Sequence, residues 1–158
     1  MRRIPCKGRR GQRGLAMVEF ALALPLLVLL LLAVSEIGRM LLQFNSLLQA
    51  NRDAVRYVAG KAFDRTQGRV EVGATLRTET QNLAVYGSPV VRLGMQPLVP
   101  GLSTANVQVS TVAGTTDHVQ VSISYTFQPL FGSGLPALVG SSMRLDFPLV
   151  ATTVMRAL

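Results

Sequence analysis

The chain has few of the residues that most often carry catalysis or hold metals. It contains one cysteine, one histidine and no tryptophan among its 158 residues. The single Cys6 cannot form an internal disulfide, so we expect the fold to be held by packing. The single His118 follows Asp117 in a predicted hairpin, and we interpret it as a surface residue. The sequence also has no P-loop, H-E-x-x-H, G-x-S-x-G or C-x-x-C motif.

These absences argue against an enzyme. A catalytic histidine needs a nucleophile or an acid held within reach, and only its chain neighbour Asp117 is evident. The eight acidic residues form no short-spaced cluster of the kind that binds Ca²⁺. We therefore predict no catalytic residue, no metal site, no cofactor and no small-molecule substrate.

The positive charge is concentrated at one end of the chain. The net charge is +8, and the first 14 residues carry six of the 16 basic residues and no acidic residue. The other ten basic residues are nearly balanced by eight acidic ones. No mixed aromatic and basic patch accompanies them, so we predict no nucleic-acid binding. A basic segment next to an apolar run instead indicates a leader that stays in the cytoplasm while the rest of the chain is exported.

The apolar residues are concentrated directly after this leader. Residues 15–34 read LAMVEFALALPLLVLLLLAV, with Glu19 as the only charge. Twenty helical residues span about 30 Å, the hydrocarbon thickness of a bilayer. We predict a transmembrane helix that Pro25 kinks, which membrane helices tolerate.

The helical pattern continues beyond the apolar run to about Gly60, but it becomes amphipathic. An apolar stripe recurs at three- and four-residue steps, and it is either core for its own domain or an interface with other subunits. Glu36 and Arg39, three residues apart, are expected to pair on the helix surface. The stripe comprises Ile37, Leu41, Phe44, Leu48, Val55 and Val58.

The remaining residues, 61–158, predict a small α+β domain. A second helix is expected over 69–85, and a short strand over 90–93. Strict alternation of apolar and polar residues over 119–128 is the clearest strand signal, and a shorter alternation at 107–110 precedes it. The AGTTD segment between them suits a hairpin loop, and a last strand is expected over 143–155.

The N-terminal half resembles the TadE-like family, which comprises pseudopilin-type components of the bacterial tight-adherence (Tad, or Flp) pilus. The resemblance is densest over residues 8–60, and two weaker segments lie at 125–130 and 154–156. The residues that carry it are a leader glycine, a Val-Glu-Phe-Ala stretch, a proline and a Gly-Arg pair: Gly14, Val18, Glu19, Phe20, Ala21, Pro25, Gly38 and Arg39.

This resemblance implies a role for the opening residues. A membrane aspartyl peptidase, the prepilin peptidase, would cut after Gly14, and Leu15 would become the new N-terminus. Glu19 would then be the fifth mature residue and, with Phe20, would serve peptidase recognition and subunit pairing. A carboxylate in a spanning helix is costly, and an amine partner from a neighbouring subunit would offset that cost.

Taken together, the prediction is an α+β protein with a long N-terminal transmembrane helix and a small periplasmic domain with an antiparallel sheet. The divisions are 1–14 (leader), 15–34 (transmembrane), 35–60 (amphipathic continuation) and 61–158 (periplasmic domain). Its role would be that of a minor pseudopilin or an anchored assembly component in the bacterial inner membrane. Its partners would be the peptidase, other Tad assembly proteins and pilin subunits, with surface attachment and biofilm formation as consequences.

Three alternatives remain open from the sequence. The leader could stay uncleaved, which would leave a single-span anchor. The chain could be a single-span periplasmic ligand-binding module unrelated to pili, which predicts a concave apolar pocket. Cleavage after Ser35 could instead release a secreted enzyme, but the apolar run is longer than the 7–15 residues usual in a signal peptide.

Overall fold

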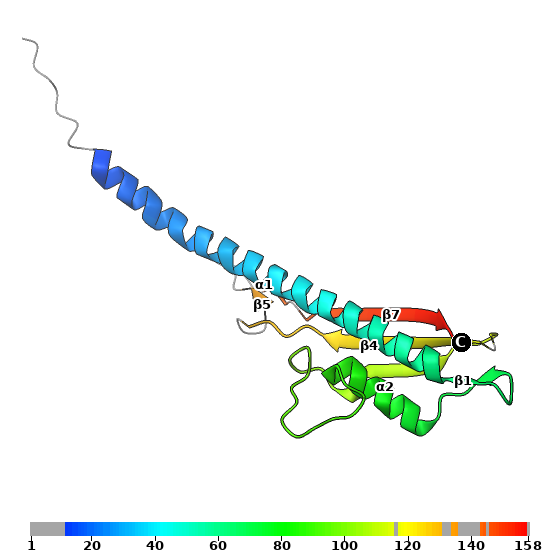
Figure 1. Cartoon of the computed structure of the whole chain (residues 1–158). Helices are drawn as coiled ribbons and strands as arrows, with labels where there is room; N and C mark the ends of the chain where they lie inside the picture. Colours follow the sequence, from blue (N-terminus) through cyan, green and yellow to red (C-terminus); the bar gives the residue numbers. More distant parts are fainter. Residues whose placement is uncertain (1–11, 116, 131–133, 136–142, 145, 158) are drawn as a thin grey trace, which may run out of the picture.

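A computed structural model describes residues 12–115, 117–130, 134–135, 143–144 and 146–157 of the chain. One long helix, α1 (Gln12–Lys61), leads into a small domain that lies along one side of its C-terminal half (Figure 1). The predicted α+β class, with a long apolar N-terminal helix followed by antiparallel sheet, is confirmed. The leader residues 1–11 lie outside the described part.

Helix α1 runs without interruption through the apolar segment and the amphipathic segment. Pro25 lies inside it. The helix persists because leucine and alanine dominate its sequence, and both are strong helix formers. A short hairpin follows, in which β1 (Phe63–Asp64) pairs antiparallel with β2 (Arg69–Val70).

The second helix, α2 (Ala74–Tyr86), begins five residues later than the sequence pattern indicated. Residues 69–70 pair with β1 instead of opening the helix. Gly87 ends α2 in the left-handed conformation, with φ of 73°, and its N–H bonds to the Leu83 carbonyl. The strand predicted over 90–93 is wrong, because these residues form bends and a turn in the loop between Gly87 and Gly101.

The main sheet has three antiparallel strands in the order β3-β4-β7. Their bounds are Val107–Thr111, His118–Thr126 and Pro148–Arg156, and a short 3-10 turn, η1 (Thr104–Asn106), precedes β3. The hairpin predicted at 113–117 is confirmed, since β3 and β4 pair in the register Val109↔Val121. A separate pair, β5 (Gly134–Leu135) and β6 (Met143–Arg144), lies between β4 and β7 in sequence.

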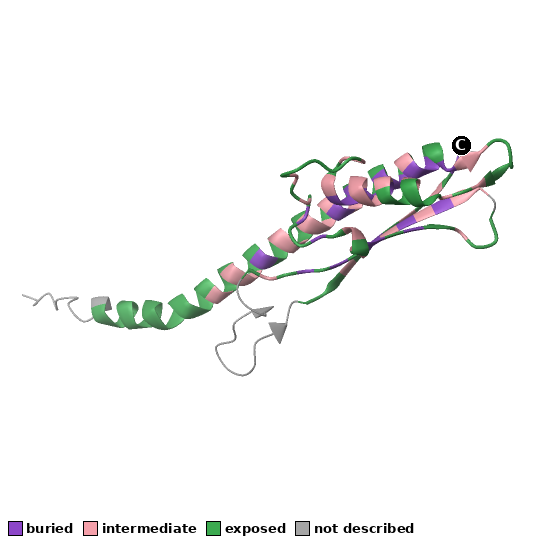
Figure 2. Ribbon diagram, turned by 90° about the horizontal axis from the view of Figure 1, so that it is seen from below, coloured by how far each residue is buried: buried purple, intermediate pink, exposed green. Residues whose placement is uncertain are grey.

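The core lies between the sheet and the two helices. Alternate residues of β4 face it, and Val119, Val121 and Ile123 are fully buried there. Figure 2 shows buried residues on the C-terminal half of α1 and along the sheet, whereas the N-terminal half of α1 is exposed. Small side chains bring α1 close to the strands, and the α1 residues buried in this core are Leu47, Ala50, Asn51, Ala54, Val55, Val58 and Ala59.

The structure divides the apolar stripe of α1 in two. Val55 and Val58 are buried in the core, and Phe44 and Leu48 are partly buried. Ile37 and Leu41, in contrast, are 46% and 53% exposed. The C-terminal part of the stripe is therefore core, while its N-terminal part is open surface.

Candidate functional site

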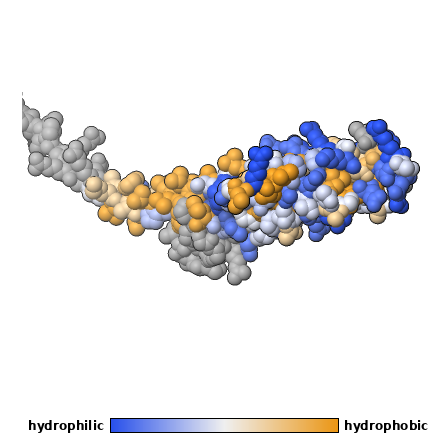
Figure 3. Space-filling view, turned by 60° about the horizontal axis from the view of Figure 1, so that its bottom comes forward, coloured by the Kyte–Doolittle hydropathy of each residue, from blue (hydrophilic) through white to orange (hydrophobic). Residues whose placement is uncertain are grey.

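Helix α1 is the one helix in the described residues that is long and apolar enough to cross a membrane. Its most apolar 18-residue window has a mean hydropathy of 2.7, and none of that window is buried by the other described residues. Figure 3 shows these hydrophobic side chains as a continuous surface on the part of α1 that projects from the domain. The length and composition are consistent with a single-pass membrane protein.

The residues predicted to act in processing and assembly all lie on this projecting part. Leu15 and Phe20 are 73% and 61% exposed, and Glu19 is exposed as well. A Cβ added at Gly14 would meet no atom within 4 Å. Leu15 and Glu19 are one helical turn apart, about 6 Å along the axis. Among the described residues Glu19 has no ion-pair partner, and the roles assigned to these residues remain predictions.

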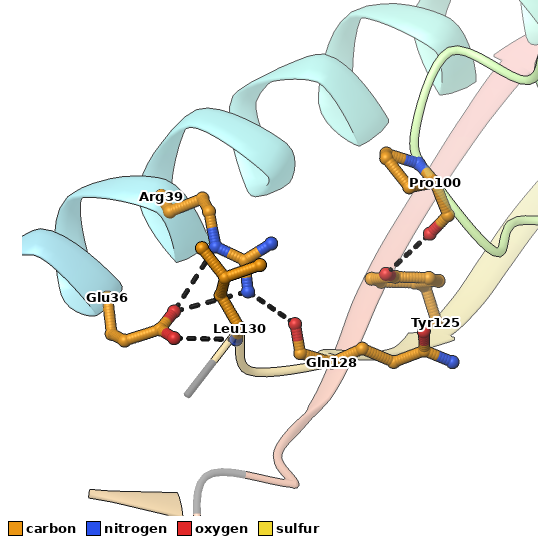
Figure 4. Close-up of polar contacts among 6 residues, drawn as sticks. All are labelled: Glu36, Arg39, Pro100, Tyr125, Gln128 and Leu130. Atoms are coloured by element: carbon orange, nitrogen blue, oxygen red, sulfur yellow. Dashed lines mark hydrogen bonds and ion pairs between the residues drawn. The ribbon is translucent and has the colours of Figure 1, made fainter. Parts of the chain in front are cut away.

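A second polar site lies where α1 enters the domain, and we call it the clasp. It consists of Glu36 and Arg39 on α1 together with the segment 127–130 that follows β4 (Figure 4). Glu36 Oε2 is 3.2 Å from Nη2 of Arg39, and Glu36 Oε1 accepts a 2.6 Å hydrogen bond from the Leu130 amide. Arg39 also donates to the Gln128 carbonyl. Side chains one turn apart on α1 thus satisfy backbone groups that would otherwise have no strand partner.

Two aromatic residues at the end of β4 add further contacts at the clasp. The Arg39 guanidinium lies 5.0 Å from the centre of the Phe127 ring, in a cation–π arrangement. Tyr125 donates a 2.8 Å hydrogen bond to the Pro100 carbonyl, which ties the 87–101 loop to the same place (Figure 4). Burial raises the pKa of the Tyr125 hydroxyl above its ordinary value of 10.0.

The predicted Glu36–Arg39 pair is confirmed, but its setting differs from the prediction. Only 2% of Glu36 is exposed, so the pair is not ordinary helix surface. Spacing alone could not show this, because the covering residues 127–130 are about 90 positions away. The signal available in the sequence was the resemblance, since both Gly38-Arg39 and the segment 125–130 belong to it. The structure brings these two segments into contact.

The far end of the domain carries two smaller charged groups. Tyr57 donates a 2.7 Å hydrogen bond to Glu79, and Lys61 lies 3.5 Å from the same carboxylate. The Tyr57 hydrogen bond and then Lys61 hold the pKa of Glu79 below its ordinary value. Asp117 lies 2.7 Å from both His118 and Arg156. Across the described residues no cluster of three or more metal-ligating side chains forms.

Comparison with known proteins finds a family match in the N-terminal half of the chain. The family model described as "TadE-like protein" matches residues 14–56. The match confirms the resemblance and points to a component associated with the Tad pilus. It begins at Gly14, takes in the projecting part of α1 and includes both α1 residues of the clasp. No curated protein and no solved structure matches the chain significantly.

Proposed function

We propose that this chain, whose residues 14–56 match TadE-like proteins, is a minor pseudopilin or a membrane-anchored assembly component of a Tad pilus. The single observation that carries the proposal is the exposed apolar half of α1, which continues into the helix that the clasp joins to a small domain. Such a molecule acts through protein–protein contacts, and we propose that it is not an enzyme. Its partners are the prepilin peptidase, other Tad assembly proteins and pilin subunits.

The proposed topology follows from charge and hydropathy. The basic residues 1–14 stay in the cytoplasm, residues 15–34 span the bacterial inner membrane, and the domain lies in the periplasm. Cleavage after Gly14 removes the basic leader and leaves a Leu15 amine. The amine is one helical turn from Glu19 and is cationic at neutral pH. Surface attachment and biofilm formation are downstream of this assembly role.

The deciding experiment is intact mass and N-terminal sequencing of the membrane-bound protein, with and without a co-expressed prepilin peptidase. The proposal predicts loss of residues 1–14 only when the peptidase is present. Gly14→Leu should prevent cleavage because the peptidase requires a small residue there, whereas Gly11→Leu is the matched leader control and should be cut. A full-length chain in both samples would contradict the processing step.

The pairing role of Glu19 has its own test. Glu19→Ala removes the carboxylate that would meet the amine of a neighbouring subunit, so pilus assembly should fall while the protein remains in the membrane. Glu71→Ala is the control, because Glu71 is an exposed carboxylate of the domain. Normal pili with Glu19→Ala and unchanged processing would rule out the pairing role.

A further inference from the structure

Helix α1 leaves no linker between the domain and the segment proposed to span the membrane. It continues without a break from the apolar residues 15–34 into the part that packs on the sheet. Glu36 and Arg39 follow Val34 by two and five residues, which places them about 3 Å and about 7.5 Å farther along the helix axis. The headgroup layer of a bilayer is roughly 5–7.5 Å thick on each side. With residues 15–34 in the hydrocarbon, the clasp therefore lies at the depth of the headgroups.

Two large apolar side chains outside α1 are exposed beside the clasp. Leu130 is 68% exposed, and its amide donates the 2.6 Å hydrogen bond to Glu36 Oε1. Phe147 is 51% exposed, and its carbonyl accepts a 3.1 Å hydrogen bond from the Phe127 amide. Phe127 in turn packs against Arg39. These contacts hold Leu130 and Phe147 at the place where α1 enters the domain, and so at the depth of the headgroups.

The position of these two side chains indicates what they contact. Single exposed apolar side chains are ordinary on protein surfaces, so exposure alone would not identify a partner. A side chain that lies at headgroup depth next to a spanning helix, however, is surrounded by lipid. Apolar side chains are favoured at the boundary between headgroups and acyl chains, because they leave water there. The bilayer is therefore the partner that fits Leu130 and Phe147.

Val154 provides a comparison on β7, farther from the membrane. It is 48% exposed, nearly as much as Phe147. Its neighbour Thr153 accepts a hydrogen bond from Asn51, which lies 17 residues beyond Val34 and thus about 25 Å farther along α1. Figure 1 shows β7 running beside α1 toward the C-terminal end of the helix. Val154 therefore lies well outside the headgroup layer.

We propose that the clasp end of the domain rests on the membrane surface, with the side chains of Leu130 and Phe147 at the boundary between headgroups and acyl chains. The partner is the lipid of the bilayer that α1 itself spans. The proposal rests on the proposed function, because that function places residues 15–34 across the bilayer. The two side chains give the domain an attachment to the membrane in addition to the helix.

Single-tryptophan variants of the full-length protein test the depth of each position. The chain has no tryptophan, so each variant carries one indole whose emission reports one place. The protein is reconstituted alone in vesicles of phosphatidylethanolamine and phosphatidylglycerol, with and without bromine on the acyl chains. Leu130→Trp and Phe147→Trp should be quenched by the brominated lipid several-fold more strongly than Val154→Trp, because bromine quenches only an indole close to the acyl chains.

Dissolved acrylamide gives the reciprocal measurement, and it should quench Val154→Trp most strongly. Melting curves identify any variant that fails to fold. Such a variant is replaced by cysteine at the same position in a Cys6→Ser background, labelled with an environment-sensitive dye. Equal quenching by brominated lipid at 130, 147 and 154, or no quenching at 130 or at 147, would overturn the proposal.

High salt distinguishes an apolar contact from an electrostatic one. Salt screens the attraction between exposed charges and phosphatidylglycerol, but it leaves the burial of apolar surface in place. The quenching of Leu130→Trp and Phe147→Trp by brominated lipid should therefore persist at high salt. Loss of that quenching would overturn an apolar contact.

Leu27→Trp separates failure of this inference from failure of the proposed function. Leu27 is 54% exposed near the middle of residues 15–34, and its indole should be quenched in the same vesicles. Quenching of Leu27→Trp without quenching at 130 and 147 would overturn only the contact between the domain and the membrane. No quenching of Leu27→Trp would overturn the membrane span, and this inference with it.

Discussion

Glu36 is a carboxylate that the chain buries where a helix surface residue was expected. Its two oxygens are occupied by different parts of the molecule, Arg39 on α1 and the Leu130 amide after β4. Hydrogen bonds to a charged group contribute more than neutral ones, and a buried group left without its partner is costly. Glu36 is therefore a structural residue at the junction between the projecting helix and the domain.

Replacing Glu36 tests this role. Glu36→Ala leaves the Leu130 amide without its acceptor and leaves Arg39 with the Gln128 carbonyl but not the carboxylate, so we expect the free energy of unfolding to fall by on the order of 1–3 kcal/mol. Thermal unfolding of the full-length protein in detergent measures the loss, and hydrogen exchange should rise at the Leu130 amide. Glu71→Ala, at an exposed carboxylate, should change stability by less than about 0.5 kcal/mol. Equal effects of the two variants would contradict the clasp.

Asp117 lies at the opposite end of the domain from Glu36, and it makes the stability of the fold depend on pH. The hydrogen bond from His118, and then the charges of His118 and Arg156, hold the pKa of this carboxyl below its ordinary value of 3.8. The folded chain thus binds the proton less well than the unfolded chain. The stabilisation is present above pH 3.8 and is lost as the pH falls through the lowered folded pKa.

The corresponding prediction compares wild type with Asp117→Asn. The variant should melt at a lower temperature at pH 6, and the difference between the two proteins should shrink as the pH falls below the ordinary value of 3.8. Melting curves measured from pH 6 to pH 3 provide the check. A difference that stays constant over this range would show that the carboxylate charge is not responsible.

At the scale of elements, α1 and β7 are joined by a buried polar contact. Asn51 is fully buried, and its amide donates a 2.9 Å hydrogen bond to the Thr153 hydroxyl. The Asn51 side-chain oxygen has no hydrogen-bond partner in the part of the chain that the structure describes. The contact therefore orients α1 across the sheet while leaving part of the amide unsatisfied.

A double-mutant cycle separates the contribution of the Asn51–Thr153 hydrogen bond from the cost of burying the Asn51 amide. Thr153→Val leaves the Asn51 amide unpaired as well, and we expect a loss of about 1–3 kcal/mol of unfolding free energy. Adding Asn51→Leu removes the polar group itself and should recover most of that loss. Thr126→Val is the control, because Thr126 is an exposed threonine at the end of β4. A double variant no more stable than Thr153→Val would contradict this account.

The elements differed in how far the sequence could predict them. Helix α1 and strand β4 were predictable, because long runs of one periodicity leave little choice of structure. The start of α2 and the loop around Val90 were not. Residues 69–70 join a strand pair, and an apolar run as short as 90–93 fits a strand or a loop equally well. The clasp was missed for another reason, since pairing over about 90 residues depends on topology and not on local pattern.

At the scale of the whole molecule, the N-terminal half of α1 is exposed, and none of its most apolar window is buried by the other described residues. An arginine at the centre of a spanning helix costs roughly 2.5–3.5 kcal/mol on insertion scales. Leu26→Arg should therefore make the apparent free energy of membrane insertion less favourable by roughly 2.5–3.5 kcal/mol in a translocation assay. Leu93→Arg is the control, because Leu93 is fully exposed in a loop of the domain. Unchanged insertion of Leu26→Arg would mean that this segment does not span the membrane.

The position of the clasp determines how the molecule would carry mechanical load. Arg39 and Glu36 hold the segment that leaves the end of β4, and β4 is the central strand, with β3 and β7 on either side. Tension applied along α1 from the membrane side would therefore pass directly into the middle of the sheet. Because β4 is hydrogen-bonded along both edges, that pull must shear two ladders together instead of opening one bond at a time. The clasp thus links α1 to the one strand of the three-stranded sheet that is paired along both edges.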